Sequence, residues 1–175
     1  MPANVQQTFD LIHDYHRRLE WDTLLREAYT IDDAAPDVGV EAVCTARRRL
    51  GGFSFRTRYV TFRRPDLAAV VLVGRPPFFE KWAASIRHVP IAEGSSEVTY
   101  TLTSTCRPAS MAWAIEPIAL AAFRLETRRR LRALAGHLAR VQERRRRDGE
   151  PEPAISARNP ATCRCSAGAR PPPGR

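Results

Sequence analysis

Few residues in this chain combine the side-chain types and the spacing that metal binding or catalysis requires. His13 and His16 are three residues apart and Glu20 follows four residues later, so one helix through this segment would carry three metal-ligand side chains along one face. The spacing is common by chance, and surface histidines are its usual outcome, so we predict no metal site. His88 and His137 have no evident carboxylate or nucleophile partner, and the sequence contains no phosphate-binding glycine loop, serine-nucleophile elbow or zinc-protease motif. We therefore assign no catalytic residue and no cofactor.

The positive charge is concentrated near the C-terminus. The 175-residue chain has a net charge of +9, and residues 1–123 contain 14 basic and 14 acidic side chains, so the excess belongs to residues 124–175. Such a surface attracts phosphate in anionic lipid or nucleic acid, although an exposed, arginine-rich helix face is the simpler interpretation. Residues 124–175 contain no aromatic side chain, which argues against nucleic acid as the partner. An anionic membrane surface would meet Arg128, Arg129 and Arg132.

The first residues have neither the basic segment nor the apolar segment of a secretory signal, and no run of ~20 apolar residues is present. We therefore expect a cytoplasmic protein without a disulfide framework. Cys44 and Cys106 lie in strand-like runs and are expected to be buried. Cys163 and Cys165 are too few for a closed zinc site, which needs four ligands, and we assign them no role.

A long amphipathic helix is the clearest element, and we expect it from Pro117 to Arg147. Proline suits the first turn of a helix, where its missing N–H costs nothing, and residues 109–116 are expected to form a preliminary helical turn. The apolar side chains of the long helix recur at helical spacing and are Phe123, Leu131, Leu134, Leu138 and Val141.

Six segments have the patterns of β-strands, and a sheet is what such a helix needs to bury its apolar side. The segments cover residues 24–31, 40–49, 54–62, 67–73, 78–89 and 97–106. The last alternates most clearly, with Val98, Tyr100, Leu102 and Ser104 on one face and threonines on the other. Ahead of the strands, residues 5–20 predict a short amphipathic helix, followed by a short turn at residues 20–22.

Gly51 and Gly52 predict a two-residue hairpin turn between the second and third strands, because glycine readily adopts the positive φ angles that such turns require. With Leu50 opposite Phe53, the register pairs Cys44 with Tyr59 and Thr45 with Arg58. One face of this hairpin is then small and aromatic, and the other is mostly charged and hydroxylic. An antiparallel sheet with one covered face has this composition.

The elements together predict an α+β fold with one domain over residues 1–147. Residues 148–175 contain six prolines and almost no large apolar side chain, so we expect a disordered, basic, proline-rich tail.

The order of helix, antiparallel strands and long C-terminal helix resembles the helix-grip superfamily, which includes START-type lipid-transfer domains, polyketide cyclase/dehydratase-like proteins and coenzyme Q-binding relatives. The residues that carry the resemblance lie at 5–14, 20–22, 38–39, 59–65 and 97–100, among them Phe9, Trp21 and Pro65. The resemblance implies a curved sheet wrapped around the last helix, with a cavity between them that holds an apolar small molecule. The family opens with a strand just before the equivalent of Pro2, and this sequence begins at that point. Either the true start lies upstream, or the exposed sheet edge pairs with something else.

The side chains expected to face the helix would line this cavity, and we predict them as the ligand-binding residues: Cys44, Phe55, Tyr59, Leu72, Trp82, Ile86, Tyr100, Leu102, Phe123 and Leu131. Packing of the same residues into a filled core is the alternative. The predicted function is binding or transport of a small hydrophobic, lipid-like or polyketide-like molecule. Two alternatives remain open: a cyclase or dehydratase that uses the same cavity, with Tyr59, Tyr100 or His88 as first candidates for proton transfer, and docking of the arginine-rich helix on an anionic surface. The oligomeric state is undetermined.

Overall fold

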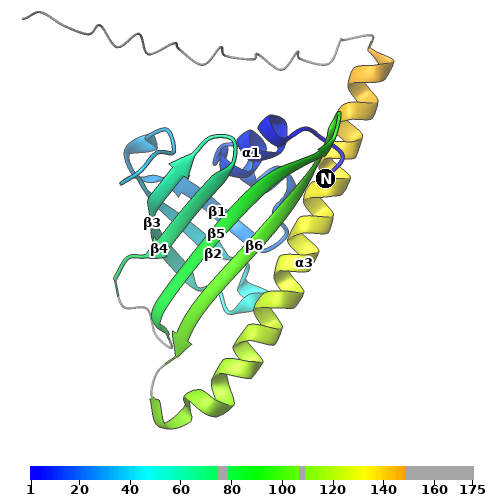
Figure 1. Ribbon diagram of the computed structural model, residues 1–175. Coiled ribbons are helices and arrows are strands. Elements are labelled where there is room, and N and C mark those ends of the chain that lie inside the picture. The colour runs from blue at the N-terminus through cyan, green and yellow to red at the C-terminus, as the bar shows by residue number, and fades with distance from the viewer. Residues whose placement is uncertain (75–78, 107–108, 149–175) are drawn as a thin grey trace, which may run out of the picture.

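The computed structural model describes residues 1–74, 79–106 and 109–148, and Figure 1 shows a curled antiparallel sheet with one long helix running beside it. The sheet has six strands in the order β1 to β6, each paired with its neighbour in sequence. The strands are β1 (Leu25–Thr30), β2 (Glu41–Ala46), β3 (Ser54–Arg63), β4 (Leu67–Leu72), β5 (Phe79–Ala92) and β6 (Ser95–Cys106). The helices are α1 (Val5–His13), α2 (Arg18–Trp21) and α3 (Ala109–Arg147), with single 3-10 turns at Ile31–Asp33 and Arg48–Leu50.

This is the helix-grip α+β fold that the sequence predicts. Within the described residues no strand precedes α1, and β1 and β6 each pair on one side only. The N-terminal residues are nevertheless tied to the sheet. The backbone N–H of Ser96 donates to the carbonyl of Met1 at 3.1 Å, and its hydroxyl donates to the carbonyl of Ala3 at 2.9 Å.

The single helix expected over residues 5–20 is wrong, because α1 ends at His13 and α2 begins at Arg18. Asp14 terminates α1: its backbone is extended, and its carboxylate accepts the backbone N–H groups of His16 and Arg17 at 3.1 and 3.3 Å. A side chain that offers the backbone such bonds competes with helix propagation. After the break, α2 packs against β1 and α3.

The predicted start of the long helix at Pro117 is also wrong, since α3 begins at Ala109 and continues through the proline. A proline inside a helix removes the hydrogen bond to the carbonyl four residues earlier, here that of Trp113. Pro117 and Trp113 are both exposed, so the carbonyl is accessible to water near the start of the helix, which bends there in Figure 1.

The predicted register of the β2–β3 hairpin is wrong by four residues. Cys44 lies opposite Phe55 rather than Tyr59, and Thr45 lies opposite Ser54 rather than Arg58. Gly51 and Gly52 do have positive φ angles, +89° and +63°, but the 3-10 turn before them lengthens the connection. Because side chains alternate with period two, an even shift leaves every residue on its predicted face.

The two halves of α3 have different neighbours. Leu134 and Leu138, in the second half, are buried in a cluster with Leu11 and Ile12 of α1 and Trp21 of α2. The first half lies across the open side of the sheet, and its apolar side chains do not fill the space between. No helix among the described residues is long and apolar enough to cross a membrane.

Three predictions fall on residues outside those described. They concern Phe78 at the start of the fifth strand, Pro108 at the end of the sixth, and the tail from residue 149 onward with Cys163 and Cys165.

Candidate functional site

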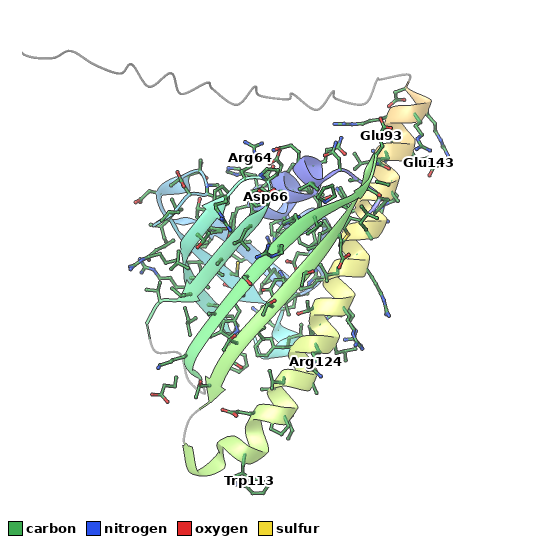
Figure 2. All side chains as sticks on the ribbon, in the orientation of Figure 1. Arg64, Asp66, Glu93, Trp113, Arg124 and Glu143 are labelled. Carbon is green, nitrogen blue, oxygen red and sulfur yellow. The ribbon has the colours of Figure 1, made fainter. Side chains whose placement is uncertain are left out.

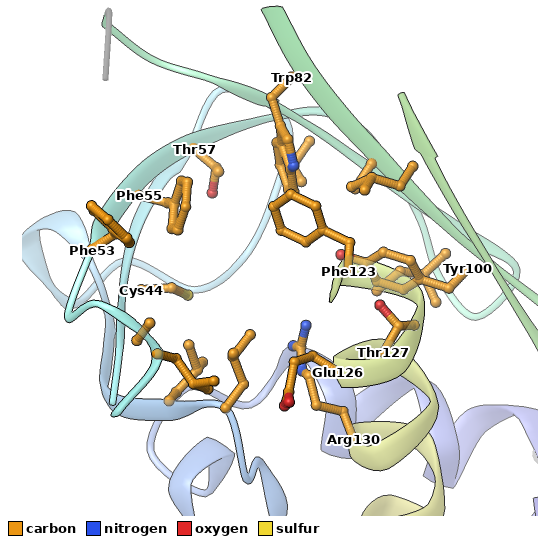
Figure 3. A pocket seen from close by; sticks show the side chains of 18 of the residues that line it. Cys44, Phe53, Phe55, Thr57, Trp82, Tyr100, Phe123, Glu126, Thr127 and Arg130 are labelled. Atoms are coloured by element: carbon orange, nitrogen blue, oxygen red, sulfur yellow. The ribbon is translucent and has the colours of Figure 1, made fainter. Parts of the chain in front are cut away.

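A cavity of about 770 Å³ lies between the inner face of the sheet and the first half of α3. Figure 3 shows aromatic side chains around it, with Phe53 and Phe55 on one side and Trp82, Tyr100 and Phe123 on the other. The rings of Phe55 and Trp82 are stacked, with centroids 6.4 Å apart. Volume and lining are typical of sites that enclose drug-sized ligands.

Eight of the ten predicted ligand-binding residues line this cavity: Cys44, Phe55, Tyr59, Trp82, Ile86, Tyr100, Leu102 and Phe123. Leu72 and Leu131 do not. Leu72 lies opposite Thr57 on the inner face of the sheet but is not part of the cavity wall. Leu131 lies further along α3, where it lines a second, much smaller cavity together with Ile12 and Trp21. Whether the eight wall residues contact a ligand stays a prediction.

The cavity wall also carries a chain of three polar side chains that the sequence did not predict as a group. The Nδ1 atom of His13, at the end of α1, lies 2.9 Å from the hydroxyl oxygen of Tyr59. The same hydroxyl lies 3.2 Å from the hydroxyl of Tyr15. Nε2 of His13 has no hydrogen-bond partner among the described residues. The sequence predicts Tyr59 on this wall but not His13 or Tyr15, because it predicts helix through the turn at Asp14 that positions Tyr15.

Burial sets the protonation states of this chain. It lowers the pKa of His13 well below the usual value, and the charge of nearby Arg18 lowers it further. Burial also raises the pKa of Tyr59 to about 12 and the pKa of Tyr15 well above its ordinary range. At neutral pH the group is therefore a neutral imidazole beside two neutral phenols, able to donate and accept hydrogen bonds in a largely apolar wall.

His88, one of the candidates for proton transfer, is not part of the cavity wall. Its ring is buried behind Phe9, with centroids 5.2 Å apart, and neither ring nitrogen has a hydrogen-bond partner among the described residues. Burial lowers its pKa to about 4, against a small opposing effect of Asp66. Tyr100, the remaining candidate, does line the cavity.

A buried ion cluster forms the other polar part of the wall. Asp22 is fully buried; its Oδ2 atom accepts hydrogen bonds from Nε of Arg18 at 3.0 Å and from Nε and Nη2 of Arg130 at 3.1 and 2.7 Å, and its Oδ1 accepts the N–H of Leu24. Burial opposes the ionised carboxylate, but the charges and hydrogen bonds of the two arginines outweigh it and lower the pKa of Asp22. Both arginines line the cavity.

The expected exposed, arginine-rich face of the long helix does not include Arg130, whose side chain is 13% exposed. One signal was present. Arg130 stands four residues before buried Leu134, on the apolar side of the helix, where a charged residue needs a buried partner. By contrast Arg128, Arg129 and Arg132 are exposed, and Arg129 pairs with Glu126 at 2.6 Å.

The three side chains considered as a metal triad are directed to different partners. His13 contacts Tyr59, His16 lies 3.3 Å from Asp33, and Glu20 lies 3.5 Å from His137. The break between α1 and α2 removes the common helix face that the spacing implied. Over the described ranges no cluster of three or more His, Cys, Asp or Glu side chains is arranged to hold a metal ion.

A curled sheet closed by a long helix around an apolar cavity defines the helix-grip fold, which is a hydrophobic ligand-binding fold. The chain belongs to the family described as polyketide cyclase/dehydrase and lipid transport, whose model matches residues 1–139. A comparison with curated proteins gave no match.

Solved structures with the same fold share little sequence with this chain. A START superfamily protein from Mycobacterium smegmatis has a TM-score of 0.64 at 12% identity, with 81% of this chain and 93% of that chain covered. The di-domain ARO/CYC StfQ from the steffimycin biosynthetic pathway has a TM-score of 0.67 at 10% identity. The match covers 81% of this chain and 49% of StfQ, about half of the length of StfQ. Ara h 8.0201 has a TM-score of 0.56 at 11% identity, with 79% and 91% covered. At these identities the likeness establishes the fold alone.

Proposed function

We propose that this protein binds a small, predominantly apolar molecule in the cavity between the sheet and α3. The observation that supports this most is the unfilled volume of about 770 Å³ behind Phe55, Trp82 and Phe123. Packed protein interiors contain few voids larger than a water molecule. A space of this size walled by aromatic rings therefore has the dimensions and lining of a ligand-binding site. Membership of a family described by lipid transport and polyketide chemistry supports the same proposal.

The first test is native mass spectrometry of the purified protein, followed by organic extraction and identification of what leaves with it. We expect a lipophilic molecule, lipid-like or polyketide-like, at one per chain. In parallel, the neutral fluorescent probe phenylnaphthylamine should bind with a saturable blue shift, since transfer of its apolar surface from water is worth ~25 cal/mol per Å².

A matched pair of tryptophan substitutions separates cavity binding from general stickiness. Trp82→Ala removes a wall residue and should weaken binding of the probe several-fold, on the order of tenfold. Trp113→Ala removes a tryptophan that is 81% exposed, in the first turns of α3 and away from the sheet (Figure 2). This substitution should leave binding of the probe unchanged. Equal loss in both variants, or a folded protein that binds no probe and releases no lipophile, would refute the proposal.

A second candidate function is catalysis of ring closure or dehydration in the same cavity. The hydrogen-bonded chain of His13, Tyr59 and Tyr15 favours it, because a neutral imidazole and a neutral phenol on one apolar wall can hydrogen-bond the oxygen of a bound carbonyl compound and stabilise the negative charge that develops there. The test is mass spectrometry of a linear poly-β-ketone thioester incubated with protein. Wild-type protein should accelerate loss of water from the thioester. Tyr59→Phe should abolish this acceleration but still bind phenylnaphthylamine. Equal rates with wild type and Tyr59→Phe would exclude this role for the chain.

Two further expectations from the sequence stay predictions: a cytoplasmic location, and contact between an anionic membrane and Arg128, Arg129 and Arg132. Their exposure on α3 is compatible with such contact. Binding to anionic vesicles that persists unchanged from low to moderate salt would contradict an electrostatic contact.

A further inference from the structure

The ion cluster in the cavity wall has more positive than negative charge. Arg18 and Arg130 share the single carboxylate of Asp22, and the side chains of the two arginines are 9% and 13% exposed. Two guanidinium groups against one carboxylate leave one positive charge beside the cavity. Such an imbalance is costly in a buried site, because a charge removed from water needs a counter-charge or hydrogen-bond acceptors.

The other titratable groups nearby do not cancel this charge. Glu126 lines the same cavity, but it is paired with Arg129 at 2.6 Å, so the two neutralise each other. Cys44, Tyr15 and Tyr59 lie near Arg18, yet burial raises the pKa of each, so all three are neutral at neutral pH. Within the described residues, the excess charge of the cluster has no protein counter-ion.

The geometry of Arg130 directs this charge toward the cavity. Its Nε and Nη2 atoms bond Asp22, which leaves Nη1 outside the ion pair, and Figure 3 shows the side chain at the wall beside Thr127 and Glu126. Arg18 is fixed from behind: its Nη1 donates to the carbonyl of Ile12, and its guanidinium lies over the ring of Trp21 at 4.8 Å. The cluster is therefore held rigidly, and a bound anion would meet donors that need no rearrangement.

We propose that the ligand is amphipathic and carries one anionic group, a carboxylate or an equivalent acid, which binds against Arg130 and Arg18 while its apolar body lies among Phe55, Trp82 and Phe123. This inference rests on the proposed function and adds the charge of the ligand. Arginine presents its N–H groups in a planar fork that matches a carboxylate, and such charge-assisted bonds are about twice as strong as neutral ones. The ligand anion balances the wall and completes the ion cluster.

The test uses two dyes with the same aromatic skeleton: anilinonaphthalene sulfonate, which is anionic, and phenylnaphthylamine, which is neutral. Arg130→Gln should weaken binding of the sulfonate about tenfold, the lower range for a hydrogen bond to a charged group, and should change binding of the neutral dye by less than about twofold. The glutamine keeps a donor for Asp22, and Asp22 keeps its pair with Arg18.

Arg132→Gln is the matched control, because it removes the same charge two residues away at an exposed position of α3. It should leave both dyes within about twofold of wild type. Equal weakening of both dyes in Arg130→Gln, or an equal effect of Arg132→Gln on the sulfonate, would overturn the anion site while leaving the apolar cavity in place. Binding of neither dye to folded wild-type protein would overturn the proposed function as well.

A second test uses wild-type protein, so its result does not depend on whether the Arg130→Gln variant folds. Dodecanoate and dodecan-1-ol have the same chain and differ in the charge of the head group at neutral pH. We expect dodecanoate to displace bound phenylnaphthylamine at about tenfold lower concentration than the alcohol. Equal displacement, or stronger displacement by the alcohol, would contradict the proposal.

Discussion

Replacement of Asp22 by asparagine tests whether the buried ion cluster holds the fold together. The carboxylate is inaccessible to solvent and accepts four hydrogen bonds, three of them from the guanidinium groups of Arg18 and Arg130. Asparagine is nearly isosteric but neutral, so two buried guanidinium groups would remain without a carboxylate. Loss of one member of a buried ion pair typically costs about 3–5 kcal/mol, because the uncompensated charge stays buried.

That loss is large for a domain whose total free energy of unfolding is of the order of 5–15 kcal/mol. For a chain of this length each kcal/mol corresponds to roughly 2–4 °C, so we expect the melting temperature of Asp22→Asn to fall by about 10 °C. The assay is urea unfolding at pH 7, followed by the fluorescence of buried Trp21, with thermal unfolding alongside.

Two comparisons make the result specific. Asp37→Asn removes an exposed carboxylate that accepts the neighbouring N–H of Val38, and should change the free energy of unfolding by less than about 0.5 kcal/mol. Adding Arg130→Met to Asp22→Asn removes one of the two unpaired buried charges and should restore part of the loss. The cluster does not stabilise the fold if Asp22→Asn lowers the free energy of unfolding by less than about 1 kcal/mol. The same holds if Arg130→Met lowers it by as much in the Asp22→Asn background as it does alone.

Three other measurements follow from the structure. The pKa of buried His88 is about 4, so its neutral ring stabilises the fold fully above the unfolded pKa of ~6.5 and progressively less as the pH falls toward 4. His88→Leu should therefore flatten the decline of the free energy of unfolding between about pH 7 and pH 4.5, and an unchanged slope would contradict this. The lowered pKa of Asp22 acts at lower pH, since its stabilisation is present above the unfolded pKa of ~3.9 and is lost below it, so Asp22→Asn should be less acid-sensitive below pH 4 than wild type. Leu134→Ala, at a fully buried site, should cost about 2–5 kcal/mol in urea unfolding, whereas Leu125→Ala, half exposed on the same helix, should cost under about 1 kcal/mol; similar losses would argue against the packing of α3 on α1 and α2.

Patterns with a short period were sufficient to predict the elements and the faces of the sheet. Along β6 the alternation of Val98, Tyr100 and Leu102 with threonines places the first three toward α3, as the half-buried positions confirm. The β2–β3 hairpin shows how robust this inference is: its register was wrong by four residues, yet Cys44 and Phe55 still line the cavity, because an even shift preserves the face.

The polar part of the site depends on contacts between residues far apart in sequence, and local patterns do not contain them. Asp22 meets Arg130 across 108 positions, and His13 meets Tyr59 across 46. Whether a histidine or an arginine on an amphipathic helix is solvated or buried depends on which segment packs over it, and that is set by the turn at Asp14 and the path of α3. The sequence alone thus determined the strands, the long helix and the apolar side chains that face each other, since each follows from periodicity within one element. Only the tertiary structure decided that the space between them stays open and that a charged cluster forms part of its wall, because both depend on the relative placement of α1, α2 and α3.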